Sequence, residues 1–287
     1  MTLARILVPV RGDGRGEGVL AHAVTLARRF SAHIETIHCR AKTEDMMPFG
    51  VVVPAFLKEQ IASSMTRLAD SEEEHLKGLF DHYTTAAGLD VVEPGALPPS
   101  GRASLTWHEV EGRQADIVGV RGRLADLICV AQPDRDTSLG LNTLYAGLVQ
   151  AGRPCLMCPP GEAPADPLAH LAIAWNGSTE AARAVALGST LIGSAGRVSI
   201  VTGGATDDGV SAEDFARTLA VRGITADIRS FRTTGDIGGA ILHEAGDCGA
   251  SALLMGAYHQ SRGREQLFGG VSQHIVEHAT LPVVMVH

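Results

Sequence analysis

The residues best suited to chemistry lie in a glycine-containing loop near the C-terminus. An apolar run predicted as a strand stops at Gly256, a polar loop with Arg262 follows, and Gly269 and Gly270 open a predicted helix. A helix N-terminus behind such a loop can hold an anion, because its first backbone N–H groups are unpaired and point into the loop. Glycines at both ends of a loop also occur simply as turn residues. The loop is therefore a candidate phosphate site, with a plain turn as the alternative.

Short apolar runs alternate with amphipathic helical patterns along the whole chain. Runs such as Ile6–Val10 and Ala252–Met255 are continuous, as expected for strands buried on both faces of a parallel sheet. The helical patterns between them predict an α/β fold with helices on both faces of the sheet. A proline-dense segment, Pro159–Pro167, separates two such series, which predicts domains at residues 1–160 and 168–287.

The two series form an internal repeat. Ile6–Asp13 aligns with Leu171–Ser178 at an offset of 165, and Asp126–Ala131 aligns with Ala252–Ala257 at an offset of 126. The difference, 165 − 126 = 39 residues, is extra chain in the first half.

An insertion at residues 41–101 accounts for this extra chain. It contains a predicted amphipathic helix, Ala55–Ala87, and a Pro/Gly-rich link, Glu93–Gly101. We expect the helix and the link to cover or flank the cleft of the first half.

Polar residues and a glycine follow the predicted strands of the second half. In an open parallel sheet, ligands bind beyond the carboxyl ends of the strands, where the strand order reverses. Here these ends are Ala174, Trp175 and Asn176, then Thr202, then Gly256. Asn176 can hydrogen-bond a ribose hydroxyl or a base edge, and it can equally serve as a turn or capping residue.

Two stretches resemble the universal stress protein (UspA) family. The first runs from Met255 through the glycines before Ser272 to the closing apolar strand, and Ala174–Val185 is similar to that family's opening strand and helix. The resemblance extends over both halves, in the tandem two-domain form. It implies two doubly wound, Rossmann-like α/β domains, each with a five-stranded parallel sheet in the order 3-2-1-4-5. It also implies a non-enzymatic stress-response protein that binds ATP or another adenine nucleotide.

The family's ATP motif, Gly-x2-Gly-x9-Gly-[Ser/Thr], is matched at two of its four positions. Gly256 and Gly269 stand at the first and third positions, whereas His259 and Gly270 stand at the second and fourth. A histidine there either obstructs backbone approach to a phosphate or contacts the phosphate itself. The implied site comprises the following residues: Ala174, Trp175, Asn176, Thr202, Gly256, His259, Arg262, Gly269, Gly270, Val271 and Ser272.

The first half departs further from the motif. Val130 aligns with the first glycine, and Arg11 stands where the family has an aspartate, which is Asn176 in the second half. We therefore expect the first half to bind no nucleotide and to be structural or regulatory.

Composition and charge disfavour nucleic-acid-binding, membrane and secreted proteins. A formal net charge of -8 and the lack of a basic run disfavour nucleic acid and anionic membranes as partners. No apolar run approaches the roughly 20 residues of a membrane span, and the N-terminus is typical of a first strand rather than a signal peptide. Five cysteines, mostly in apolar runs, indicate reduced thiols in a cytoplasmic protein. Of these, Cys155 and Cys158 would point to opposite faces of one strand, which favours structural thiols.

The fifth strands predict how the halves assemble. Pro154–Cys158 and Pro282–Val286 are short and apolar, and they lie at a sheet edge in this strand order. Because an uncovered edge tends to pair, we expect the halves to pack around these strands as a pseudo-two-fold pair, and a homodimer stays open.

The alternative function is an interaction module without a nucleotide site. An ATP hydrolase is disfavoured, because no metal-binding carboxylate or general base accompanies the loop.

Overall fold

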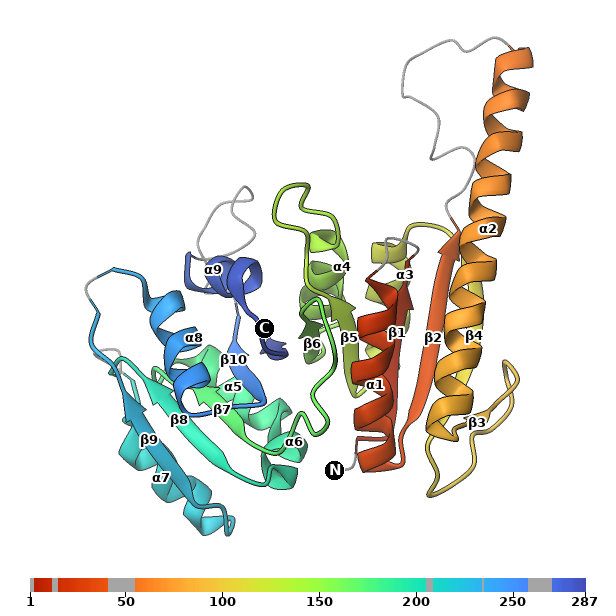
Figure 1. Cartoon of the computed structure of the whole chain (residues 1–287). Helices are drawn as coiled ribbons and strands as arrows, with labels where there is room; N and C mark the ends of the chain where they lie inside the picture. Colours follow the sequence, from red (N-terminus) through yellow and green to blue (C-terminus); the bar gives the residue numbers. More distant parts are fainter. Residues whose placement is uncertain (1–2, 12–14, 41–54, 205–208, 234, 258–269) are drawn as a thin grey trace.

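The computed structural model describes residues 3–11, 15–40, 55–204, 209–233, 235–257 and 270–287, with the backbone alone at 55–69 and 72. Its eleven strands form one continuous mixed sheet with helices on both faces (Figure 1). The strands of the first half are β1 (Arg5–Val10), β2 (His33–Arg40), β3 (Asp90–Val91), β4 (Ser104–Glu111), β5 (Leu127–Ala131) and β6 (Cys155–Cys158). Those of the second half are β7 (Leu171–Ala174), β8 (Val198–Thr202), β9 (Ala226–Ser230), β10 (Ala252–Gly256) and β11 (Val283–Val286).

Helices connect the strands. The first half has α1 (Gly16–Phe30), α2 (Ala55–Ala87), α3 (Gln114–Arg121) with a 3-10 turn at Gly122–Leu124, and α4 (Leu141–Tyr145), which continues as a π-helix over Ala146–Gln150. The second half has α5 (Thr179–Leu187), α6 (Ser189–Ser194), α7 (Ala212–Val221), α8 (Ile237–Asp247) and α9 (Gly270–His278). Helices α5 and α6 are separated by Gly188, where a methyl group would lie 2.8 Å from the Ala184 carbonyl oxygen.

The order of the strands confirms the predicted topology. Across the sheet it is β3-β4-β2-β1-β5-β6-β11-β10-β7-β8-β9, which contains the order 3-2-1-4-5 once in each half. The two-residue strand β3 adds a sixth strand to the first half, so the expectation of five strands holds for the second half alone. The division into domains at residues 160 and 168 stays a prediction, since the sheet runs through both halves.

The fifth strands join the halves, as predicted. β11 pairs antiparallel with β6, with Val283 opposite Met157 and Met285 opposite Cys155. The core is continuous on each face: one layer lies under α1, α2, α5 and α7, and the other under α3, α4, α8 and α9. Cys155 belongs to the second layer and Cys158 to the first, so the two thiols face opposite sides of the sheet, and burial raises the pKa of both.

Strand register corrects the alignment of the repeat. Ile6 pairs with Leu127, and Leu171 pairs with Ala252. Aligning Ile6 with Leu171 therefore aligns Leu127 with Ala252, an offset of 252 − 127 = 125 rather than 126. The residue that corresponds to Gly256 is thus Ala131 and not Val130.

The insertion places its two parts at opposite ends of the sheet. Leu76 of α2 packs beside Gly16 at the start of α1, and Phe80 packs edge-on against Trp107 of β4. The link, in contrast, lies at the amino edge, where Val92 accepts a hydrogen bond from Thr106 at 2.8 Å. Because β4 runs parallel to β2, the segment that feeds β4 must arrive at this edge. Of the two predicted parts, only the helix flanks the first cleft.

Within the described ranges, no helix is both long enough and apolar enough to cross a lipid bilayer.

Candidate functional site

The strand order of the second half reverses beside β7, which has β8 on one side and β10 on the other. The carboxyl ends of these three parallel strands carry Trp175, Thr202 and Gly256. The backbone N–H of Trp175 donates to the carbonyl oxygen of Val201 at 2.9 Å, which continues the pairing past the end of β7. The structure thus brings these predicted site residues together at one edge, where doubly wound folds bind ligands.

Gly256 makes a close backbone contact at this edge. A methyl group on it would lie 2.5 Å from the carbonyl carbon of Glu180 and 2.8 Å from the nitrogen of Ala181. Both atoms belong to the first turn of α5, so the end of β10 lies directly against the start of that helix. Only glycine fits there without moving backbone.

The turn after β7 is built by three polar or small residues. The side-chain oxygen of Asn176 accepts from the Ser178 N–H at 3.2 Å, and the Ser178 hydroxyl caps α5 by accepting from Ala181 at 3.2 Å. Gly177, with a φ of +76°, lies so close to Val210 that a methyl group would be 2.4 Å from its nitrogen. Both predicted roles of Asn176 remain open, because its amide nitrogen makes no hydrogen bond to another described residue.

Trp175 is part of the core. Its indole N–H donates to the Val210 carbonyl at 2.9 Å, and its ring stacks on Phe215 with the centroids 4.2 Å apart. The side chain is buried, so it holds the segment before α7 against the sheet and leaves its backbone at the cleft.

Thr202 and the glycine after it close the cleft on the side of β8. The buried Thr202 hydroxyl accepts from the Gly204 N–H at 3.1 Å. A methyl group on Gly203 would lie 2.8 Å from the ring of Phe231, so this turn is packed as closely as the one after β7.

Helix α9 begins at Gly270 and is fixed at both ends. Near its start His274 packs on Gly238 of α8, and His274 Nδ1 lies 3.4 Å from the carboxylate of Asp236. At its end the carbonyl oxygens of Val276 and Ala279 accept from the Gln132 side chain at 2.7 and 3.2 Å. Gln132 belongs to the first half, so one half positions a helix of the other.

The remaining predicted residues divide into two groups. Ala174 ends β7 beside the cleft, Val271 is half-buried on α9, and Ser272 is buried there. His259, Arg262 and Gly269 lie outside the described residues, so their roles stay predictions.

Comparison with known proteins now adds to this geometry. Residues 162–287 match the model of the universal stress protein family. The second half of the chain therefore matches this family. The resemblance found in the sequence is thereby confirmed. A search of curated proteins finds no match.

Solved structures extend the likeness to the whole chain. A universal stress protein from Archaeoglobus fulgidus DSM 4304 aligns over 99% of this chain and 96% of its own, with a TM-score of 0.69 and 14% identity. A protein of unknown function from Pseudomonas aeruginosa PAO1 covers 99% and 92%, with a TM-score of 0.54 and 14% identity. A putative universal stress protein from Pseudomonas aeruginosa UCBPP-PA14 covers 99% and 93%, with a TM-score of 0.53 and 14% identity. At this identity the likeness shows a shared fold.

In the first half of the chain, side chains fill the corresponding cleft. The guanidinium of Arg11 lies 3.0 Å from where a methyl group on Gly140 would stand, at the start of α4. Arg15 donates to the Gln132 carbonyl at 2.8 Å and pairs with Asp134 at 2.5 Å. The cavity between these elements holds about 10 Å³, room for one water molecule. Sequence reasoning identified Arg11 but missed Arg15, whose role depends on a loop 117 positions away.

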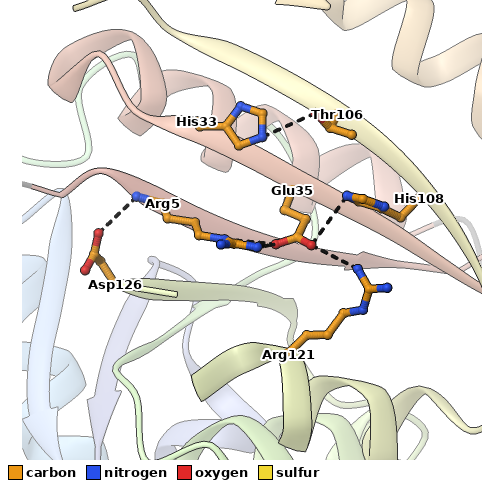
Figure 2. A network of polar contacts seen from close by, with 7 residues as sticks. All are labelled: Arg5, His33, Glu35, Thr106, His108, Arg121 and Asp126. Carbon is orange, nitrogen blue, oxygen red and sulfur yellow. Dashed lines mark hydrogen bonds and ion pairs between the residues drawn. The ribbon is translucent and has the colours of Figure 1, made fainter. Parts of the chain in front are cut away.

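A second polar cluster lies at the opposite, amino edge of the first half (Figure 2). Glu35 of β2 has a buried side chain that accepts from Arg5 of β1 and, at 3.0 Å, from Arg121 of α3. His108 of β4 lies 3.4 Å from the same carboxylate. Burial alone would raise the pKa of Glu35, but the Arg5 hydrogen bond and the nearby positive charges hold it below its usual value. The cluster ties three strands to a helix, and it is structural, because the cleft lies at the other edge.

Proposed function

We propose that this universal stress protein is a non-enzymatic regulatory protein that binds an adenine nucleotide, ATP first among them, in the cleft of its second half. The contact between Gly256 and the start of α5 carries the proposal, because it keeps side-chain atoms out of the place where the strand order reverses. Family membership supports a role in the stress response.

The proposed pose follows from the elements around the cleft. The phosphates lie against the N–H groups at the start of α9, from Gly269 to Ser272, since a helix N-terminus favours anions. Asn176 faces the ribose, and the Thr202–Gly203 turn faces the base. Arg262 and His259 are proposed to neutralise phosphate charge from the loop between β10 and α9.

An interaction module is the competing function, and the first half favours it for that part of the chain. Arg11 and Arg15 occupy the cleft that a ligand would need, while Gln132 supports α9 of the other half. The first half then acts as a covalently attached partner of the second.

Titration calorimetry with ATP, AMP and cyclic AMP tests the proposal. We expect the wild type to bind one of these nucleotides and Gly269→Val to bind none, because a branched side chain blocks backbone approach to the phosphate. The control is Gly246→Ala on α8, where a methyl group meets no atom within 4 Å. If the wild type binds none of the three at about millimolar concentration, the interaction module replaces the nucleotide-binding protein.

Two further measurements sharpen the result. His259→Gly strengthens binding if the imidazole obstructs the phosphate, and weakens it if the imidazole contacts the phosphate. Phosphate release from bound ATP should stay at the rate of free ATP, and faster release would contradict the non-enzymatic role.

A further inference from the structure

A groove runs along the outer face of α1 and adjoins the cleft of the first half, with which it shares Ala131. Its volume is about 610 Å³, within the range of small-molecule sites. α1 forms the floor, Tyr83 of α2 one wall, and the segment Pro159–Ala163 between the two halves the other wall. The charged residues of its lining are Arg15, Glu17 and Glu162.

Small side chains on a rigid helix create the groove. Gly18 lies under the connecting segment, where a methyl group would be 3.4 Å from the Gly161 carbonyl oxygen. Ala21 and Val24 continue the floor with an apolar surface, and Thr25 turns its hydroxyl back to the Ala21 carbonyl at 3.0 Å. The floor therefore offers carbon atoms rather than hydrogen-bonding groups.

The charges at the groove are unbalanced. Arg15 at the inner end is paired with Asp134, 2.5 Å away, so these two charges offset each other. The carboxylates of Glu17 and Glu162 have no basic partner among the lining residues. The next arginine on this face of α1, Arg28, lies beyond the lining. The groove thus combines an apolar floor with an excess of negative charge.

Tyr83 adds an aromatic wall beside one of these carboxylates. Its hydroxyl donates to Glu17 at 3.2 Å, which holds the ring at the edge of the groove. An aromatic ring next to a carboxylate attracts ammonium groups, because the ring face and the carboxylate are both negative.

We propose that this groove binds a small organic cation, an ammonium group on an apolar body. The ammonium group lies at Glu17 and Glu162 against the ring of Tyr83, and the apolar body covers Ala21 and Val24. The site is independent of the nucleotide cleft, because its lining residues come from the first half and the connecting segment. An anion is disfavoured, since the one lining arginine is already paired.

Calorimetric titration with benzyltrimethylammonium tests the site, with benzyl alcohol and benzoate as the neutral and anionic counterparts of similar size. We expect the cation to bind with a dissociation constant of about 1 mM or tighter, as the efficiency of small ligands allows. Added salt should weaken the binding, because screening reduces the attraction between exposed charges. Equal or tighter binding of either counterpart would overturn the proposal.

Three variants locate the binding. Glu17→Gln should weaken it about fivefold, and Glu17→Gln combined with Glu162→Gln about twentyfold, as expected for exposed charge pairs. Ala21→Leu should weaken it at least about tenfold by filling the floor, while all variants keep the wild-type melting temperature within a few degrees. Glu74→Gln, an exposed carboxylate on α2 away from the groove, is the matched control. Unchanged binding by the double variant, or no cation binding to wild type at about 10 mM, would show that the groove is not this site.

Discussion

The two halves share a strand order but end their central strands differently. At the carboxyl edge, Gly256 lets the start of α5 touch β10, whereas Ala131 at the corresponding position carries a methyl group. Arg11 and Arg15 then fill the space beside Ala131. The two edges therefore differ by one added carbon and two long cations, so a shared fold does not imply a shared ligand.

The two halves also differ in the polar residues at the amino ends of their strands. In the first half, Glu35 lies between Arg5 and Arg121. In the second half, Ser199 stands at the position of Glu35 and His170 at the position of Arg5. His170 Nε2 lies 2.7 Å from the Ser199 hydroxyl, and an ion pair between Arg197 and Asp227, 3.2 Å long, lies near them. The first half thus buries its carboxylate at this edge, whereas the second half keeps its ion pair more exposed.

The largest effect should come from exchanging the residues at the carboxyl edge. Gly256→Ala forces a methyl group against the backbone of Glu180 and should cost about 3 kcal/mol, the upper end for overpacking. Ala131→Gly should cost only about 1 kcal/mol, through added chain flexibility. Urea unfolding followed by circular dichroism measures both. Equal losses in the two variants would mean that the edges are packed alike.

A smaller effect is expected from the amino edge. Glu35→Gln leaves two arginines facing an uncharged amide and should cost about 2 kcal/mol, less than a fully buried pair because Arg5 and Arg121 are 40% and 37% exposed. Ser199→Ala removes the hydrogen bonds that the hydroxyl makes with His170 and Asp227 and should cost about 1 kcal/mol.

The pH dependence of stability tests whether the buried charge of Glu35 causes the loss expected for Glu35→Gln. The folded-state pKa of Glu35 is lowered, so its contribution is present above the unfolded pKa of about 4 and is lost as the pH falls through the folded value. The difference between wild type and Glu35→Gln should therefore shrink in acid. A Glu35→Gln difference that stays constant down to pH 3 would exclude the charged cluster as its cause.

The sequence predicted those features that apolar runs and turn residues encode locally. The alternation of strands and helices, the order within each half and the pairing of the fifth strands followed from short apolar runs and the family resemblance. The offset of 125 did not, because aligning apolar letters leaves a strand free to slip by one position. The stacking of Trp175 on Phe215 joins residues forty positions apart and has no local signal. Sequence reasoning missed the cluster around Glu35, although a lone acid in the strand His33–Arg40 could have signalled a buried partner.

The contact between the halves should contribute less than either edge. Gln132→Ala removes two hydrogen bonds to the last turn of α9 and should cost about 1 kcal/mol, with Gln132→Glu costing more because a carboxylate would face two carbonyl oxygens. Hydrogen exchange of the α9 amides should quicken in both variants, while exchange in α1 stays unchanged. Equal acceleration in α1 would show general destabilisation rather than loss of this contact.

The smallest predicted effect concerns the pH dependence of stability, to which each half contributes one histidine. Burial lowers the folded-state pKa of His33 in the first half and of His170 in the second, and the positive charge of Arg197 lowers that of His170 further. Each imidazole therefore binds a proton more readily in the unfolded chain. The stability it contributes is fully present above the unfolded pKa of about 6.5 and is lost as the pH falls from there toward the folded value. We expect His170→Gln and His33→Gln each to flatten the decline in unfolding free energy between pH 7 and pH 5. The nearby Glu35 carboxylate raises the pKa of His33 and so opposes the effect of burial. If Glu35 controls the pKa of His33, then His33→Gln should flatten the decline less than His170→Gln. Combining His33→Gln with Glu35→Gln tests this directly: if the carboxylate holds up the pKa of His33, removing that histidine has a larger effect in the Glu35→Gln background than in the wild type. The same flattening in both backgrounds would show that burial alone sets the titration of His33, and that the two halves respond to acid in the same way.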